Sequence, residues 1–162
     1  MMHRFLSMAM AIILLSAFSV TRHIKGVTQN DNEVITGTAK GYLWGSGQFK
    51  ITSSSGFICD GIYNFTRGRS MPAVGGLKCD DGLQGDIVIS ALNATASTGY
   101  GIAQLNNKTY AQFVYGDVPD FKYMSWSMAK EQYAKMSKQM QGYIYYCKEY
   151  PETLKCKKSG HI

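Results

Sequence analysis

Apolar and polar residues alternate in short runs through the middle of the chain, over residues 34–116. Gly, Asn, Asp and Ser interrupt these runs about every eight to twelve positions, the spacing expected of strands joined by tight turns. No helix-length pattern with a period near 3.6 intervenes. The pattern predicts a mainly β domain at residues 34–116, an antiparallel meander or small barrel of about six to eight short strands.

Residues that favour positive φ angles mark the turns of this domain. Asp80-Asp81-Gly82 is a good hairpin signal, because an Asp-Gly pair tolerates the φ angles that a tight turn requires. The Ser- and Gly-rich run 53–56 and the Asn-rich run 106–108 separate strands in the same way. Residues 66–76, which include Pro72, are expected to form the longest loop.

After residue 116 the apolar residues change to a helical period. Intervals of four and three residues place six of them on one stripe. They are Ala129, Tyr133, Met136, Met140, Tyr143 and Cys147. The pattern predicts an amphipathic helix over about residues 123–146, within a helical, Lys-rich C-terminal segment at residues 117–162. Pro151 stops any continuation of this helix.

The start of the chain has the organisation of a targeting segment. Residues 1–4 are short and basic, residues 5–18 are apolar, and Ala17 and Ser19 fit the small-residue positions of a signal-peptidase site. The apolar run is shorter than the roughly 20 residues that cross a bilayer. We therefore expect residues 1–19 to be a signal peptide, cleaved after Ser19, and residues 20–33 to be a flexible N-terminal segment. The protein is then exported, either periplasmic or secreted.

Export changes the interpretation of the four cysteines, because an oxidising compartment favours disulfides. Four cysteines allow three pairings. Proximity in sequence favours Cys59–Cys79 and Cys147–Cys156, the second closing a loop in the C-terminal segment. A four-thiolate zinc site would need closer pairs than the spacings seen here. No metal and no cofactor are therefore expected.

The net charge of +6 is concentrated in the C-terminal segment. Residues 24–116 carry seven Lys or Arg against six Asp or Glu, whereas residues 117–162 carry eight Lys against five acidic residues. Three of these, Lys155, Lys157 and Lys158, lie close together. A basic helix and tail can bind anionic lipid or an acidic envelope polymer at a membrane surface, or can serve as a solvated face. Nucleic acid fits poorly, because the β domain has no basic cluster.

The few histidines argue against most catalytic chemistries. The chain has three, His3, His23 and His161, and none falls within a predicted strand or helix. A Ser-His-Asp or Cys-His arrangement needs an imidazole held rigidly beside its nucleophile. We therefore expect a protein that is not an enzyme. A carboxylate-based hydrolase of cell-wall glycan, using Asp60, Asp81 or Asp86, is the remaining catalytic alternative.

Glycines recur in a G-x-G arrangement at Gly45-Ser46-Gly47 and at Gly99-Tyr100-Gly101. Inside a strand pattern such glycines mark a bulge, a sharp bend or a close approach of two backbones. The order of G-x-G, strand, turn and aromatic residue over about residues 36–116 resembles the MORN repeat, a short β-hairpin unit that stacks into an elongated curved sheet. MORN proteins are mostly scaffolds and membrane-associated platforms, so the resemblance implies binding rather than catalysis.

Aromatic side chains offer a candidate binding surface. Tyr42 and Trp44 share one face of a predicted strand, and Tyr100 lies in the second G-x-G. Such residues stack on sugar rings or partner side chains, or else fill the core of a small domain. Together with Lys155, Lys157 and Lys158 they make up the candidate binding surface.

Three sequons, at Asn64, Asn93 and Asn107, would matter only in a eukaryotic secretory pathway, and the short targeting segment favours a bacterium.

The sequence as a whole predicts an exported, non-catalytic binding or scaffolding protein of the cell envelope or the medium. Its partner would be an envelope component or another protein. The alternative is a small secreted inhibitor or effector that acts on another organism's enzyme and presents residues 66–76 as a rigid loop.

Overall fold

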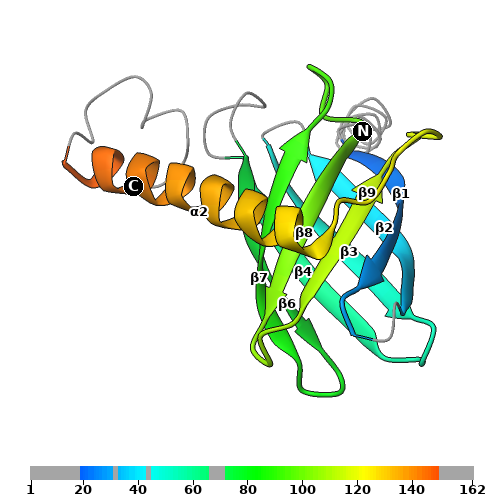
Figure 1. The fold of residues 1–162 in the computed structure, drawn as a ribbon. Helices are drawn as coiled ribbons and strands as arrows, with labels where there is room; N and C mark the ends of the chain where they lie inside the picture. Colours follow the sequence, from blue (N-terminus) through cyan, green and yellow to red (C-terminus); the bar gives the residue numbers. More distant parts are fainter. Residues whose placement is uncertain (1–18, 31–32, 43–44, 66–71, 150–162) are drawn as a thin grey trace, which may run out of the picture.

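The computed structural model describes residues 19–149 apart from 31–32, 43–44 and 66–71, with side chains described as far as residue 141. Within these residues, eight antiparallel strands close into a barrel, and one helix lies outside it (Figure 1). The strands are β1 (Ser19–Thr28), β2 (Val34–Tyr42), β3 (Ser46–Ser53), β4 (Ile58–Asn64), β6 (Ala73–Cys79), β7 (Gln84–Ala91), β8 (Gly99–Leu105) and β9 (Tyr110–Tyr115). The helix is α2 (Trp126–Glu149).

Each strand pairs with the next one along the chain, and β9 pairs back with β1 to close the sheet. This up-and-down order confirms the predicted mainly β fold, a small barrel followed by a C-terminal helix. Closure removes the free edges of the sheet except at the start of β1, where Ser19–Arg22 pair with β2 alone.

The first strand corrects an expectation. Residues 20–33 were expected to be flexible, yet Ser19–Thr28 forms β1 and pairs with both β2 and β9. Ile24, Gly26 and Thr28 alternate inward along it and are buried. Arg22 and Gly26 interrupt the apolar alternation in the sequence, which hides this strand. The β domain therefore begins at Ser19 rather than at residue 34.

The predicted turns are confirmed at one end of the barrel. Gly56, Gly82 and Lys108 have φ angles of 100°, 90° and 67° in the β3–β4, β6–β7 and β8–β9 connections. The expected loop at residues 66–76 is shorter than predicted, because β6 already begins at Ala73. Residues 66–71 of that loop lie outside the described part of the chain.

A disulfide ties two neighbouring strands inside the barrel. Cys59 on β4 stands directly opposite Cys79 on β6, and the two side chains are buried and bonded to each other. This confirms the first predicted pairing. Closing a loop of this length stabilises the fold by about 3 kcal/mol in the chain-entropy account. The predicted Cys147–Cys156 pair lies outside the described residues and side chains.

Aromatic rings pack over glycines of the neighbouring strand. A Cβ at Gly47 would overlap the ring of Tyr63, and a Cβ at Gly101 would overlap the ring of Phe113. The same relation holds between Gly99 and Tyr115 and between Gly61 and Phe49. Both G-x-G sites are therefore places of close approach, as expected, and they make room for the rings that fill the barrel.

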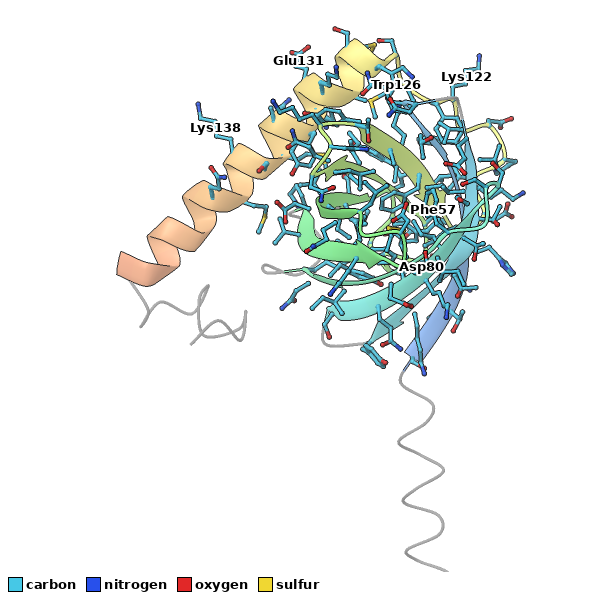
Figure 2. The ribbon with its side chains drawn as sticks, turned by 90° about the horizontal axis from the view of Figure 1, so that it is seen from below. Phe57, Asp80, Lys122, Trp126, Glu131 and Lys138 are labelled. Carbon is cyan, nitrogen blue, oxygen red and sulfur yellow. A yellow bond between two sulfur atoms is a disulfide. The ribbon has the colours of Figure 1, made fainter. Side chains whose placement is uncertain are left out.

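The helix α2 covers the outer face of β6 to β9. Its buried side chains are Ala129, Tyr133 and Met136, which pack on Val88 and Ile102 of the sheet. This confirms the predicted apolar stripe as far as Met140, which is also buried. The last turns of α2 project beyond the sheet (Figures 1 and 2). Within the described part of the chain, no helix combines the length and apolarity that crossing a membrane demands.

A buried glutamine fixes the segment that leads into α2. Gln112 on β9 points outward and is 1% exposed. Its Nε2 donates to the carbonyl of Met124, and its Oε1 accepts from the N–H of Met124, both at 2.9 Å. The amide thus pairs with the backbone as a neighbouring strand would, and it sets where the helix begins.

Candidate functional site

A broad, open groove of about 1100 Å³ crosses the outer wall of the barrel from β1 to β8. Most of its side chains occupy positions that alternate with the buried ones, so they point away from the core. We call this feature the wall groove. Its outward-facing lining residues are Thr21, Thr38, Lys40, Gln48, Lys50, Asp60, Ile62, Gly76, Lys78, Gln84, Asp86, Gln104 and Asn106.

Strand register arranges most of these residues in two cross-strand rows. In the first row each residue faces the next across a strand pair, in the order Thr38, Lys50, Asp60, Lys78 and Gln84. The second row runs in the order Lys40, Gln48, Ile62, Gly76, Asp86 and Gln104. Adjacent strands are about 4.8 Å apart, so the four spacings of the first row and the five of the second make them about 19 Å and about 24 Å long.

Glycine makes the second row hollow at its centre. Gly76 points outward, and a Cβ there would find its nearest atom, the carbonyl oxygen of Gly85, at 3.7 Å. No side chain therefore fills the wall between Ile62 and Asp86. Ile62 is 70% exposed, which is unusual for a large apolar side chain on a strand and makes it the apolar point of an otherwise polar groove.

Charges of both signs stand side by side in the first row. Asp60 lies directly between Lys50 on β3 and Lys78 on β6. Lys40 and Asp86 add one further charge of each sign in the second row. The groove thus carries three ammonium groups and two carboxylates, along with amides and hydroxyls that both donate and accept hydrogen bonds.

A smaller hollow of about 400 Å³ continues the groove along β3, β4 and β6, and it shares Gln48, Ile62 and Gly76 with it. Tyr42 lines this continuation. The ammonium of Lys40 lies 5.8 Å from the centroid of the Tyr42 ring, within cation–π distance. The structure therefore places Tyr42, one of the predicted binding residues, at the edge of the groove.

The interior of the barrel is nearly filled at the hairpin end. The cavity there measures about 30 Å³ and is lined by apolar side chains, with Phe49 and Phe113 stacked at 6.4 Å between centroids. Phe57 lies within the ring of strands at this end (Figure 2). A second cavity, of about 280 Å³, lies at the opposite end of the barrel.

Tyr100, the second predicted aromatic, belongs to the seam between barrel and helix. Its ring packs near that of Phe121, with centroids 6.2 Å apart, and its hydroxyl accepts a hydrogen bond from Gln132 Nε2 at 3.1 Å. Tyr100 therefore helps to dock α2 instead of offering an open binding face. Periodicity could not reveal this, because it does not show which strands the helix covers.

The remaining predicted binding residues are not placed. Trp44, Lys155, Lys157 and Lys158 lie outside the described residues. On α2 itself, Lys130, Lys135 and Lys138 are exposed. Figure 2 shows Lys138 pointing away from the barrel on the outer side of the helix.

The acidic residues considered for glycan hydrolysis are dispersed. Asp81 is in the β6–β7 hairpin, where its Oδ1 accepts a hydrogen bond from the N–H of Leu83. Asp60 and Asp86 stand in different rows of the groove, on strands that β6 separates. Among the described residues, no three His, Cys, Asp or Glu side chains lie close enough together to hold a metal ion.

A carboxylate links two turns at the hairpin end. Glu33 Oε1 accepts a hydrogen bond of 2.7 Å from the N–H of Ser55. Burial opposes ionisation of this carboxyl, but hydrogen bonds from Ser55 and Ser53 outweigh it and lower the pKa of Glu33 below its ordinary value. The contact braces the β1–β2 connection against the β3–β4 turn.

Comparison with known proteins found a similar structure but no matching sequence. No protein-family model matches the chain, and no curated protein matches it. The resemblance to MORN repeats therefore stays a prediction. Among solved structures the chain is similar to a de novo designed fluorescence-activating β-barrel, with a TM-score of 0.47 and 12% identity, over 64% of this chain and 95% of the designed one.

Proposed function

We propose that this chain is an exported, non-catalytic binding protein of the cell envelope or the medium, and that it holds an extended polar partner in the wall groove. The partner class that we favour is an anionic envelope polymer. The groove of about 1100 Å³ on the outer wall of the barrel is the observation that carries the proposal.

The shape of the groove supports an extended partner. Its two rows span about 19 Å and about 24 Å at the usual strand spacing, which suits several units of a chain better than one compact metabolite. The rows are built on paired strands of a closed sheet, which hold side chains in fixed positions better than loops do. Binding then needs little ordering of the protein, and this lowers its entropic cost.

The chemistry of the groove supports a polar, acidic partner. Lys40, Lys50 and Lys78 outnumber Asp60 and Asp86, so the lining carries a positive balance. Gln48, Gln84 and Gln104 present amides that donate to and accept from sugar hydroxyls or acetamido groups. Ile62 offers one apolar contact in the centre.

The basic residues of the C-terminal segment form a second part of the proposal. The apolar face of α2 packs on the barrel, so any contact of this helix with a membrane or polymer surface would be electrostatic. Lys130, Lys135 and Lys138 are exposed for such a contact, and Lys155, Lys157 and Lys158 would extend it. Contacts of this kind weaken as salt screens the charges.

The test is retention of the purified protein on isolated envelope of its host, with a groove variant and a matched control. Gly76→Tyr places a ring in the hollow where the backbone tolerates a side chain. Thr52→Tyr places the same ring on an exposed outward position of β3 that does not line the groove. We expect Gly76→Tyr to lose retention and Thr52→Tyr to keep it, and about 0.5 M salt to weaken retention of the unmodified protein.

Equal retention of the two variants would contradict the groove as the binding surface. Loss of retention in a variant that replaces Lys155, Lys157 and Lys158 by Gln, with Gly76→Tyr unaffected, would move the binding to the C-terminal tail.

A second candidate function is that of a small secreted inhibitor or effector. Ile62 favours it, because an exposed apolar side chain flanked by charges on a rigid wall suits insertion into the cleft of another protein. In that case the unmodified protein should inhibit its target enzyme and should not bind isolated envelope. The Ile62→Asp variant should no longer inhibit the enzyme.

A further inference from the structure

The cavity at the end of the barrel opposite the hairpins is a candidate site separate from the wall groove. It encloses about 280 Å³ on the inner side of the wall, where β1 begins and β2 and β4 end. We call it the barrel mouth. Its volume is just below the range typical of sites for drug-sized ligands, so it would suit a smaller molecule.

The walls of the barrel mouth differ in bulk. Ala39, Gly41 and Ala96 present little or no side chain, which leaves the space open. Tyr63 and Phe65, in edge-to-face contact with centroids 5.9 Å apart, form an aromatic wall. A slot between small residues and aromatic rings suits a flat apolar body, which can stack on the rings or meet their edges.

One cation stands at the rim of this slot. Arg22 lies two residues before the buried Ile24 on β1, so its side chain is on the same, inward-facing side of the strand, opposite Ala39 of β2. It is nevertheless exposed, because this part of β1 lies at the open end of the barrel. Among the described residues that line the barrel mouth, it is the one with a formal charge. A guanidinium offers paired N–H donors that match a carboxylate or a sulfonate.

The tyrosine of the slot stays a hydrogen-bond donor. Burial raises the pKa of Tyr63, and the neighbouring Tyr42 raises it further. The Tyr63 hydroxyl is therefore protonated at neutral pH and can donate to an acceptor on a bound molecule.

We propose that the barrel mouth binds a small anionic molecule with a flat apolar body, an aromatic carboxylate or sulfonate. The body lies between the small residues and the ring wall, and the anionic group faces Arg22. This site shares no lining residue with the wall groove itself, although Tyr42, Ser46 and Tyr63 line both the barrel mouth and the smaller hollow that continues the groove.

The experiment is an NMR titration of the ¹⁵N-labelled full chain, because a chain that began at Val20 would place a free α-ammonium beside Arg22. The probes are naphthalene-2-carboxylate and its neutral counterpart naphthalene-2-methanol. We expect shifts of the amide signals of Ala39, Gly41 and Tyr63, with the carboxylate bound about three- to tenfold more tightly than the alcohol, the range for a partly exposed ion pair.

Two pairs of variants locate the site. Arg22→Gln should remove the preference for the carboxylate, while Lys25→Gln, on the outer side of the same strand, should keep it. Val20→Trp should fill the slot from the rim and abolish binding of both probes, whereas Thr21→Trp, one residue on and facing outward, should not. Retained dispersion of the amide spectrum shows that each variant is folded.

Three outcomes would overturn the proposal: no shifts, shifts confined to residues outside the barrel mouth, or equal affinity for the acid and the alcohol. Binding of the probe by the Gly76→Tyr variant at unchanged affinity is expected, and it keeps this proposal distinguishable from the one on the wall groove.

Discussion

Glycines decide how the aromatic core fits inside so small a barrel. At Gly61 and Gly101 the ring of a phenylalanine on the neighbouring strand occupies the space that a Cβ would take. The missing side chain thus makes room for a ring, and both glycines face inward on their strands. Gly76 is the opposite case, because it faces outward and leaves a hollow that the protein does not fill.

This contrast gives a prediction at the residue scale. Gly101→Ala should lower the free energy of unfolding by about 1–3 kcal/mol, because Phe113 has to move in a filled core. Gly76→Ala, with no atom closer than 3.7 Å to the new Cβ, should change it by less than about 0.5 kcal/mol. Urea unfolding of both variants measures the difference. An equal loss of stability in the two variants would show that the ring of Phe113 is not the reason for glycine at position 101.

A second residue-scale prediction concerns pH. Hydrogen bonds from Ser55 and Ser53 lower the pKa of Glu33 in the folded protein from its ordinary value of 4.5. The folded state therefore holds the carboxylate form more firmly than the unfolded state does. The stabilisation is present above pH 4.5 and is lost as the pH falls through the lower folded value.

The melting temperature, measured between neutral and acid pH for the unmodified protein and for Glu33→Gln, tests this. The two curves should differ at neutral pH and converge in acid. A difference in melting temperature that grows toward acid pH would contradict the lowered pKa of Glu33.

Among the structural elements, α2 is attached to the barrel by an apolar stripe and by the amide of Gln112. Gln112→Met should cost about 1–3 kcal/mol in stability, because the buried N–H and carbonyl of Met124 lose their partner. Gln104→Met, on the adjacent strand and also facing outward, serves as the matched control. Hydrogen exchange of α2 amides should accelerate in the first variant only. Unchanged exchange in Gln112→Met would show that the amide of Gln112 does not hold the helix on the barrel.

The elements differ in how well the sequence predicts them. The hairpin turns, the helix and the Cys59–Cys79 pair follow from local signals, namely positive-φ residues, a 3.6-residue period and proximity. The strand β1 was not predicted, because Arg22, which lies at the open end of the barrel, interrupts the alternation of apolar and polar residues. Local patterns do not show which strand lies beside which, so they left a meander and a closed barrel as alternatives. They also did not show that α2 packs against Tyr100.

At the scale of the whole molecule the barrel uses its surfaces for different purposes. The inner face is packed with apolar side chains at one end, and one part of the outer face is covered by α2. The polar part of the outer face forms the wall groove. The residues of that groove come from seven strands, so only the strand register brings them together. The sequence pointed instead to Tyr42, Trp44 and the Lys-rich tail.

Site-specific photo-crosslinking in the native host tests the wall groove most directly. A photoreactive amino acid in place of Ile62 lies in the middle of the groove, and the same residue in place of Val34, also exposed and outward-facing, lies outside it. We predict covalent adducts with an envelope polymer from position 62 and none from position 34. Adducts from both positions alike, or from neither, would contradict the account of this protein as one that binds through its barrel wall.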